Sequence, residues 1–182
     1  MDYFVTNFDI LAIFKNAKIV RYADLDKFKD IYELLPNRMD FVFLLTESEK
    51  NSGHWTLIIR DDDSFEYFDS YGTSPKNILD YIPKYMNKKL GNNYGEDLGK
   101  MIKSIKATDK FIYNKTKFQK EQENINTCGR WCIARLSLFL SDDLNLKEFT
   151  TLMKTKAKNL KMSQDQFITF LVTVNQHLKV LI

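Results

Sequence analysis

Residues 126–135 read Asn-Thr-Cys-Gly-Arg-Trp-Cys-Ile-Ala-Arg, a pattern that predicts a turn leading directly into a buried helix. Thr127 is suited to cap this helix, which places Cys128 at the helix start. The positive end of the helix dipole favours a thiolate there, so it lowers the pKa of the cysteine. Gly129 leaves the backbone beside the sulfur uncrowded, so a substrate carbonyl can approach. The competing interpretation is a core helix with two structural cysteines, Cys128 and Cys132.

A cysteine nucleophile needs a base, and the chain contains two histidines. His177 falls near the end of a predicted C-terminal helix, where we expect a solvated cation. His54 instead opens the apolar run 53–59, which predicts a buried strand. A histidine at the mouth of a core strand is held rigidly, and its neutral ring can accept a thiol proton. A purely structural role, in which His54 hydrogen-bonds a loop, is the alternative.

A hairpin can place a carboxylate beside His54. Residues 61–63 predict a turn, residues 65–68 predict a second strand, and Asp69 follows that strand. His54 starts one strand and Asp69 ends its antiparallel neighbour, so both are expected at the same edge of the sheet. A carboxylate there would fix the ring tautomer and stabilise the imidazolium. Glu66 is a weaker candidate because it lies inside the second strand.

The oxyanion of an acyl-transfer intermediate needs hydrogen-bond donors. The backbone N–H of Cys128, at the helix start, is one such donor. A side-chain amide from the preceding polar loop is the natural second. Gln122 lies six residues upstream of Cys128 and Gln119 lies nine upstream, and we prefer Gln122. Simple solvation in a polar loop would also account for either glutamine.

Taken in order, these motifs resemble the adenovirus-proteinase-like (clan CE) cysteine peptidases. That group includes adenain, the SUMO and ubiquitin-like-protein proteases, and maturation proteases of large DNA viruses and virophages. The similar motifs are His-Trp, Asp-Ser-Tyr-Gly, Gln and Cys-Gly-x-x-Cys, within roughly residues 41–140. The resemblance implies a base at His54, an acidic orienter at Asp69, an oxyanion donor at Gln122, a nucleophile at Cys128, and substrate contacts at Trp55 and Gly129.

The resemblance implies a hydrolase, specifically a thiol endopeptidase with a Cys-His-Asp triad. Cleavage at glycine-containing sites is expected, because Trp55 would narrow the groove around the scissile bond. A chain of 182 residues without a long regulatory extension favours a viral protease that cuts capsid or scaffold precursors during maturation. A deconjugating protease for SUMO or ubiquitin-like modifiers is the runner-up. A catalytically inactive core protein that binds DNA or protein is the third alternative.

Length and composition indicate the number of domains and the expected location of the protein. The 182 residues suit one peptidase domain, 1–182, and 44% hydrophobic with 28% charged residues is ordinary for a globular protein. No apolar run has membrane-spanning length and no secretion signal is found, so we expect the host cytoplasm or viral factory and the virion interior. Two cysteines with three residues between them form no disulfide framework and lack the partners that a metal site needs. No cofactor is expected.

The predicted fold class is α+β, with a mixed central sheet of about four to five strands flanked by helices, as in adenain. The Cys128 helix should pack at the centre of the sheet. Strands are predicted at residues 41–45, 55–60, 65–69 and 111–113, with polar loops at 46–53 and 114–126. Helices are predicted at residues 7–15, 25–35, 74–90 with a kink or break at Pro83, 146–160 and 163–178.

Positive charge gathers in the middle of the chain. Residues 84–120 carry ten lysines against three acidic residues, whereas the whole chain has a net charge of +3. Such a segment could follow a phosphate backbone, and the adenovirus members of the resembled group use DNA as a helper. Nonspecific DNA binding is therefore an expectation, with a solvated helical face as the alternative. A protein substrate is the expected main partner of a monomer.

Overall fold

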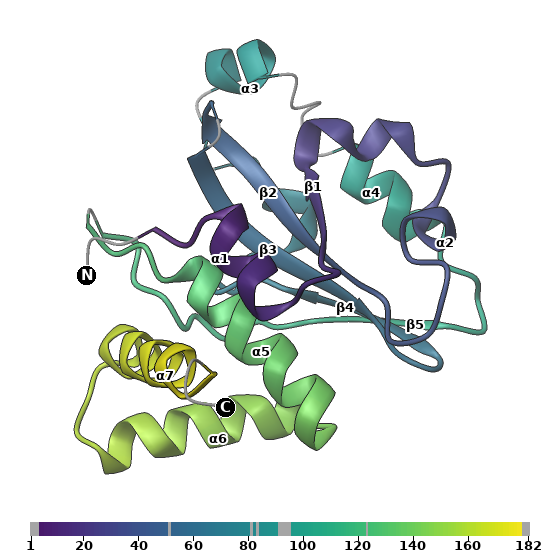
Figure 1. The fold of residues 1–182 in the computed structure, drawn as a ribbon. Helices are drawn as coiled ribbons and strands as arrows, with labels where there is room; N and C mark the ends of the chain where they lie inside the picture. Colours follow the sequence, from purple (N-terminus) through teal and green to yellow (C-terminus); the bar gives the residue numbers. More distant parts are fainter. Residues whose placement is uncertain are drawn as a thin grey trace.

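A mixed five-stranded sheet forms the centre of the computed structural model, which describes residues 4–50, 52–80, 82, 84–90, 96–122 and 124–179 (Figure 1). The strand order is β1-β2-β3-β4-β5. The strands are β1 (Lys18–Arg21), β2 (Phe41–Glu49), β3 (Ser52–Arg60), β4 (Ser64–Phe68) and β5 (Lys110–Tyr113). Strand β3 is central and antiparallel to both neighbours, while the two edge strands pair in parallel.

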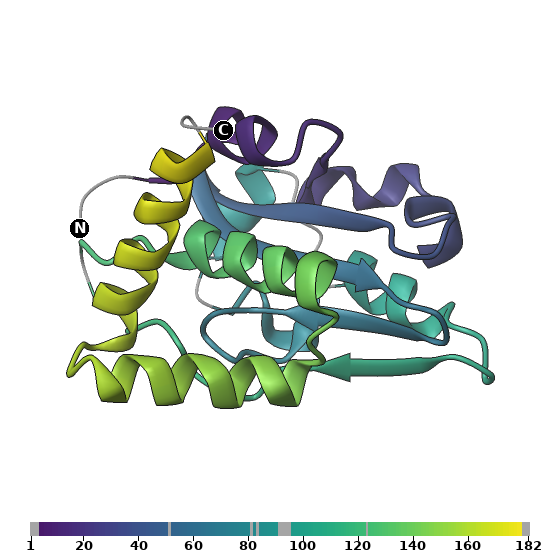
Figure 2. The same cartoon turned by 60° about the horizontal axis from the view of Figure 1, so that its bottom comes forward.

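Helices cover both faces of this sheet. One face carries α5 (Cys128–Asp142), with α6 (Leu146–Asn159) and α7 (Gln164–Lys179) outside it and α1 (Asn7–Ile13) nearby (Figures 1 and 2). The other face packs against η1 (Tyr22–Lys27), α2 (Ile31–Leu34) and α4 (Glu96–Lys103). The remaining elements are η2 (Pro75–Asn77) and α3 (Lys84–Leu90). No helix among the described residues is both long and apolar enough to cross a membrane.

Strand β3 is apolar on both sides because each side faces a separate core. Trp55, Leu57 and Ile59 point toward α5, whereas Ile58 points toward the core around η1 and α2. Because helices cover both faces of the sheet, the sequence of the strand is nearly continuously apolar and does not alternate between apolar and polar residues. The start of β3 is therefore rigidly fixed, and α5 packs across this central strand as predicted.

Most of the predicted architecture is confirmed. The α+β class, the four predicted strands, the long loop before α5 and the three C-terminal helices are all present. The polar loop predicted at 46–53 is wrong, because β2 and β3 continue into a hairpin where Thr46 pairs with His54. Strand β1 was not predicted, since a four-residue edge strand has too little pattern to detect.

Two helix predictions in the first half of the chain are wrong. A single helix at 25–35 does not form, because the carboxylate of Asp30 caps a separate short helix at the N–H groups of Tyr32 and Glu33. The helix predicted from Ser74 is only the short η2, capped by Ser74 as expected, and α3 is separate. Pro83, where we predicted a break, lies outside the described residues.

A buried ion pair fixes α5 to the sheet. Nε and Nη2 of Arg135 donate to the two carboxylate oxygens of Glu66 on β4, at 2.6 and 2.7 Å. Nη1 of Arg135 donates to the carbonyl of Leu144 beyond the helix end, at 2.9 Å. Both side chains are buried, so the geometry of the pair sets the orientation of α5 against β4.

Replacing Arg135 with Met should lower the free energy of unfolding by about 3–5 kcal/mol, because Glu66 then stays buried without its partner. Urea denaturation monitored by circular dichroism measures the change. The control is Lys117→Met, which breaks the exposed pair with Glu121 and should cost less than about 1 kcal/mol. Equal effects of the two substitutions would contradict the role given to the buried pair.

Candidate active site

His54 lies near the start of β3 and is only 5% exposed. Nε2 of His54 lies 2.7 Å from Oδ1 of Asp69. The ring stacks on that of Tyr71, with centroids 4.5 Å apart and planes inclined by 12°. The imidazole is therefore held at one nitrogen by a carboxylate and on one face by an aromatic ring.

Asp69 follows β4 and is completely buried, at 0% exposure. Residues that lie close to Asp69 in the fold hydrogen-bond both its side chain and its backbone. The backbone N–H of Tyr71 donates to Oδ1 of Asp69 at 2.9 Å. Asn114, just after β5, accepts from the N–H of Asp69 at 2.8 Å and donates to its carbonyl at 2.7 Å. Oδ2 of Asp69 has no hydrogen-bond partner in the described part of the chain, so the ordered contacts concentrate on the oxygen that faces His54.

Cys128 is the first residue of α5, and its sulfur is hydrogen-bonded to His54. Because Nε2 of His54 is engaged by Asp69, Nδ1 is the ring nitrogen left for the sulfur. The backbone N–H groups of Trp55 and Gly129 also hydrogen-bond the sulfur. The structure thus brings together the predicted nucleophile, base and acid from α5, β3 and the end of β4.

The ionisation of Cys128 and His54 is coupled. Burial acts to raise the pKa of Cys128, but the hydrogen bond and charge of His54 outweigh it and hold the pKa below the ordinary 9.0. Burial acts to lower the pKa of His54, but the charge and hydrogen bond of Asp69, assisted by Cys128, raise it from 6.5 to about 10. Both shifts favour a thiolate–imidazolium pair near neutral pH.

Cys132 has the opposite environment. Burial first, and then the nearby charges of Cys128 and Asp69, raise its pKa well above the ordinary 9.0. Its thiol donates to the carbonyl of Trp55 at 3.5 Å. Cys132 is therefore a structural thiol, as burial among apolar residues requires. No group of three or more His, Cys, Asp or Glu side chains in the described ranges could hold a metal ion.

The two candidate glutamines lie in different surroundings. Gln122 is exposed, and its side chain makes no hydrogen bond to any described residue. Gln119 is buried, and its Oε1 accepts from the hydroxyl of Ser70 at 2.8 Å. Nε2 of Gln119 donates to the hydroxyl of Tyr71 at 3.3 Å and to the carbonyl of Ile125 at 2.8 Å. No hydrogen bond to a described residue therefore fixes the side chain of Gln122, whereas Gln119 secures the loop before α5.

The N-terminal segment covers the predicted substrate contacts. The indole N–H of Trp55 donates to the carbonyl of Val5 at 2.9 Å, and both residues are buried. A Cβ added to Gly129 would lie 2.6 Å from Cβ of Val5 and 3.2 Å from Cδ1 of Trp55. Trp55 and Gly129 do lie beside Cys128, but the indole N–H faces this segment and the Trp55 side chain is buried.

Thr127 does not cap α5 with its side chain, contrary to the prediction. Its backbone is in the helical region, so its hydroxyl instead donates to Oδ1 of Asp165 on α7 at 2.6 Å. Oδ2 of Asp165 accepts from the backbone N–H of Lys120 at 3.2 Å. Asp165 therefore joins α7, the residue before the nucleophile and the preceding loop.

Comparison with known proteins identifies a virophage relative. The chain is 37% identical over 169 residues to a protein of Sputnik virophage, uncharacterized protein V9, covering 92% of this chain and 93% of V9. The chain belongs to the V9 family. No protein-family model matches it.

The fold of this V9-family chain resembles that of the pS273R protease of ASFV. The similarity to one crystal structure has a TM-score of 0.46 at 16% identity, and that to a second has a TM-score of 0.44 at 16% identity. The first match covers 82% of this chain but 62% of the protease chain, so the chain spans less than two thirds of that protein. At this identity the similarity concerns the fold, and the roles of individual residues in the V9-family chain stay predictions.

Three supporting residues were missed by sequence reasoning. Tyr71 stacks on His54, and burial followed by the charges of Cys128 and Asp69 raises its pKa to about 12, so its hydroxyl stays protonated. Tyr71 was within the quoted Asp-Ser-Tyr-Gly motif, which was the available signal. Asn114 and Asp165 act across sequence separations of 45 and 38 residues, and no local pattern indicates such contacts.

We predict that the thiolate of Cys128 depends on His54. In a Cys132→Ala background, ultraviolet absorbance should show thiolate forming below the ordinary thiol pKa of 9.0, and the signal should disappear as pH falls through this lowered pKa. Adding His54→Ala should move the titration above 9.0, because burial remains while the imidazolium is lost. An unchanged titration in the His54 variant would contradict the ion pair.

The close approach of Val5 predicts a specific penalty at Gly129. Gly129→Ala should lower the free energy of unfolding by about 1–3 kcal/mol, because the new Cβ overlaps Val5. Combining it with Val5→Gly should recover roughly 1 kcal/mol in a double-mutant cycle measured by urea denaturation. The matched control is Gly99→Ala on α4, where no atom lies within 4 Å, so it should be neutral or stabilising. Additive effects at Val5 and Gly129 would refute the contact.

Proposed function

We propose that this protein is a cysteine endopeptidase whose nucleophile is Cys128. One observation carries the proposal: Asp69, His54 and Cys128 form a continuous buried hydrogen-bonded chain that begins at a carboxylate and ends at a thiol with a lowered pKa. Such a sequence of acid, base and nucleophile is the arrangement by which thiols are activated for acyl transfer. The inert environment of Cys132 supports the choice of Cys128.

The proposed reaction has two halves. The thiolate of Cys128 attacks the carbonyl carbon of a peptide bond, and the C–N bond breaks as the imidazolium of His54 gives its proton to the leaving amine. Neutral His54 then takes a proton from water, which attacks the thioester and releases the carboxylate product with the thiolate restored. Asp69 keeps the ring oriented and stabilises the imidazolium formed in each half.

The backbone N–H of Cys128 is the first proposed donor to the oxyanion. As the first residue of α5, it belongs to the turn whose N–H groups have no partner within the helix. Gln122 stays the predicted second donor, since its side chain is free of other described partners and its loop precedes α5. This role requires the side chain to turn inward when substrate binds. Gln119 is less suited, because both of its N–H groups already have acceptors.

The proposed biological role is maturation of virus particles by cleavage of capsid or scaffold precursors, at sites that contain glycine. The virophage origin of V9 supports a viral role for the family. Glycine beside the scissile bond suits a nucleophile that is only 8% exposed and flanked by Trp55 and Gly129, because a residue without a side chain needs the least space.

The decisive experiment compares Cys128→Ala with the matched variant Cys132→Ala. Both are incubated with internally quenched peptides that carry glycine before the scissile bond. Cys128→Ala should lower kcat/KM by roughly 10³-fold or more, because no nucleophile remains, whereas Cys132→Ala should stay within a few-fold of the parent chain. A covalent peptide probe with a C-terminal electrophile should label the parent and the Cys132 variant only.

Two outcomes would contradict the proposal. Retained turnover in the Cys128 variant would remove this residue from the mechanism, and an unreactive Cys128 in the parent chain would favour a binding protein. The biological role is tested by offering a virophage capsid precursor beside SUMO and ubiquitin conjugates. Preferential cleavage of the conjugates would replace the maturation role with deconjugation.

A further inference from the structure

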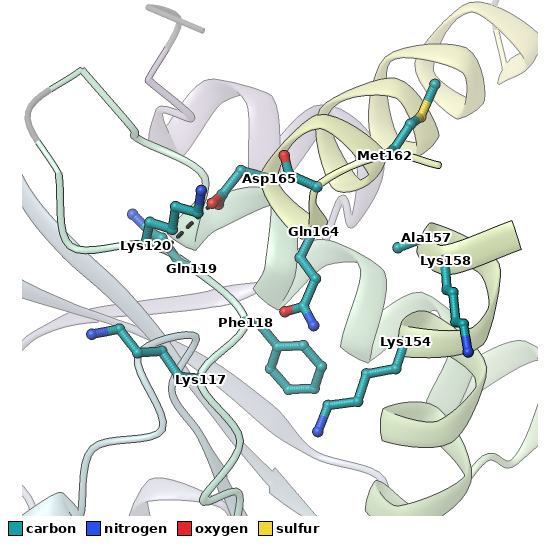
Figure 3. A pocket seen from close by; sticks show the side chains of 11 residues that line it. Lys117, Phe118, Gln119, Lys120, Lys154, Ala157, Lys158, Met162, Gln164 and Asp165 are labelled. Carbon is teal, nitrogen blue, oxygen red and sulfur yellow. Dashed lines mark hydrogen bonds between the residues drawn. The ribbon is translucent and has the colours of Figure 1, made fainter. Parts of the chain in front are cut away.

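A cavity outside the Cys128 cluster lies between the loop 117–120, the second half of α6 and the start of α7. Its volume is about 480 Å³, within the size range of sites that hold small ligands or peptide side chains. Figure 3 shows Lys154 and Gln164 extending from α6 and α7 toward the space beside the ring of Phe118. Nothing in the proposed catalytic mechanism uses this cavity.

The rim of the cavity carries unneutralised positive charge. Lys154 and Lys158 lie one turn apart on α6, and Lys120 comes from the loop. Within the described residues, none of these three ammonium groups has a carboxylate partner. Asp165 is the acidic residue in the lining, and both of its oxygens already accept hydrogen bonds from Thr127 and the backbone of Lys120. An anionic ligand would therefore find complementary charge here.

The interior of the cavity is partly apolar. The half-buried side chain of Met162 lines it beside the buried Phe118 and Ala157. The amide of Gln164 adds a hydrogen-bonding group. A free inorganic anion would leave this apolar surface unused. A ligand that combines negative charge with an apolar side chain would satisfy both parts of the lining.

This combination favours an acidic peptide over nucleic acid. Phe118 packs against Trp131 and Phe149, with centroids 4.7 and 5.7 Å apart, so its faces are taken and cannot stack with bases. Among the described residues, the lining contains no arginine, the residue best suited to bidentate phosphate contacts. The cations also surround one hollow, whereas a duplex needs cations spaced along its backbone.

One hydrogen bond links the lining of the cavity to the residue before the nucleophile. Asp165 lines the cavity and accepts a hydrogen bond from Thr127, which directly precedes Cys128. We propose that the cavity binds an acidic segment of the protein substrate, one that also carries an apolar side chain and lies near the cleaved bond. The substrate part of this statement rests on the proposed peptidase function. The complementarity of the cavity to an acidic peptide does not depend on it.

The test uses fluorescence polarisation with the full chain carrying Cys128→Ala, so that no probe is cleaved. The probes are a fluorescein-labelled peptide of alternating glutamate and leucine, a serine–leucine peptide and a labelled DNA duplex. Lys154→Gln with Lys158→Gln should weaken binding of the acidic peptide about tenfold. The matched control, Lys147→Gln with Lys156→Gln, removes the same charge from α6 outside the cavity and should change binding less than about twofold.

Three results would overturn the proposal. In the first, the acidic peptide binds no more tightly than the serine–leucine peptide. In the second, the two double lysine substitutions weaken binding equally. In the third, the DNA duplex binds in a way that depends on Lys154 and Lys158, while the peptide does not bind. The last result would identify a nucleic-acid site. The binding measurement uses the Cys128→Ala chain and therefore needs no catalysis. If the acidic peptide does not bind, the proposed peptidase function still stands. If the peptidase proposal is refuted, the binding measurement still tests the cavity.

Discussion

The contact between Nε2 of His54 and Oδ1 of Asp69, 2.7 Å apart and shielded from water, is the interaction on which the rest of the site depends. Charges interact strongly where solvent is excluded, so a buried carboxylate can raise the pKa of the imidazole despite the cost of burying both groups. The imidazolium then lowers the pKa of Cys128 against the opposing effect of burial. Without Asp69, burial would instead favour a neutral ring and a neutral thiol.

This chain of effects requires that three elements keep their relative positions. The β3–β4 pairing positions His54 and Asp69, and Asn114 fixes the backbone of Asp69 from the end of β5. Helix α5 is held at its start by the bond from Thr127 to α7 and farther along by the ion pair of Arg135. Because these restraints act at different points, α5 can neither slide along β3 nor turn without breaking a buried polar contact.

The sequence was sufficient for the residues whose positions follow from local patterns. His54 and Asp69 flank a hairpin, so the strand pattern predicted that they share one edge of the sheet. The pattern placed Cys128 at the start of an apolar helix, and its grouping with His54 and Asp69 followed from the chemistry of a thiol nucleophile and from the family resemblance. The preference for Gln122 over Gln119 had no local pattern behind it, because both lie in one polar loop and the hydrogen bonds of Gln119 go to the distant Ser70 and Tyr71. Contacts formed by the fold, such as that of Val5 on Trp55, have no signature in either segment alone.

The exclusion of water that strengthens the ion pair of Cys128 also limits the access of other molecules to its sulfur. Closing the site around Cys128, which is 8% exposed, strengthens the thiolate–imidazolium attraction because it excludes water. In the same closed site, Val5 packs against Gly129 and Trp55, the two residues predicted to contact substrate. If the protein is the proposed peptidase, its substrate displaces Val5 or passes beside it while the sheet holds His54 and Asp69 in place. The described contacts of Val5 are its carbonyl bond to the indole of Trp55 and apolar packing, whereas strand pairing and Asn114 hold His54 and Asp69. Val5 is therefore the easier of these groups to move.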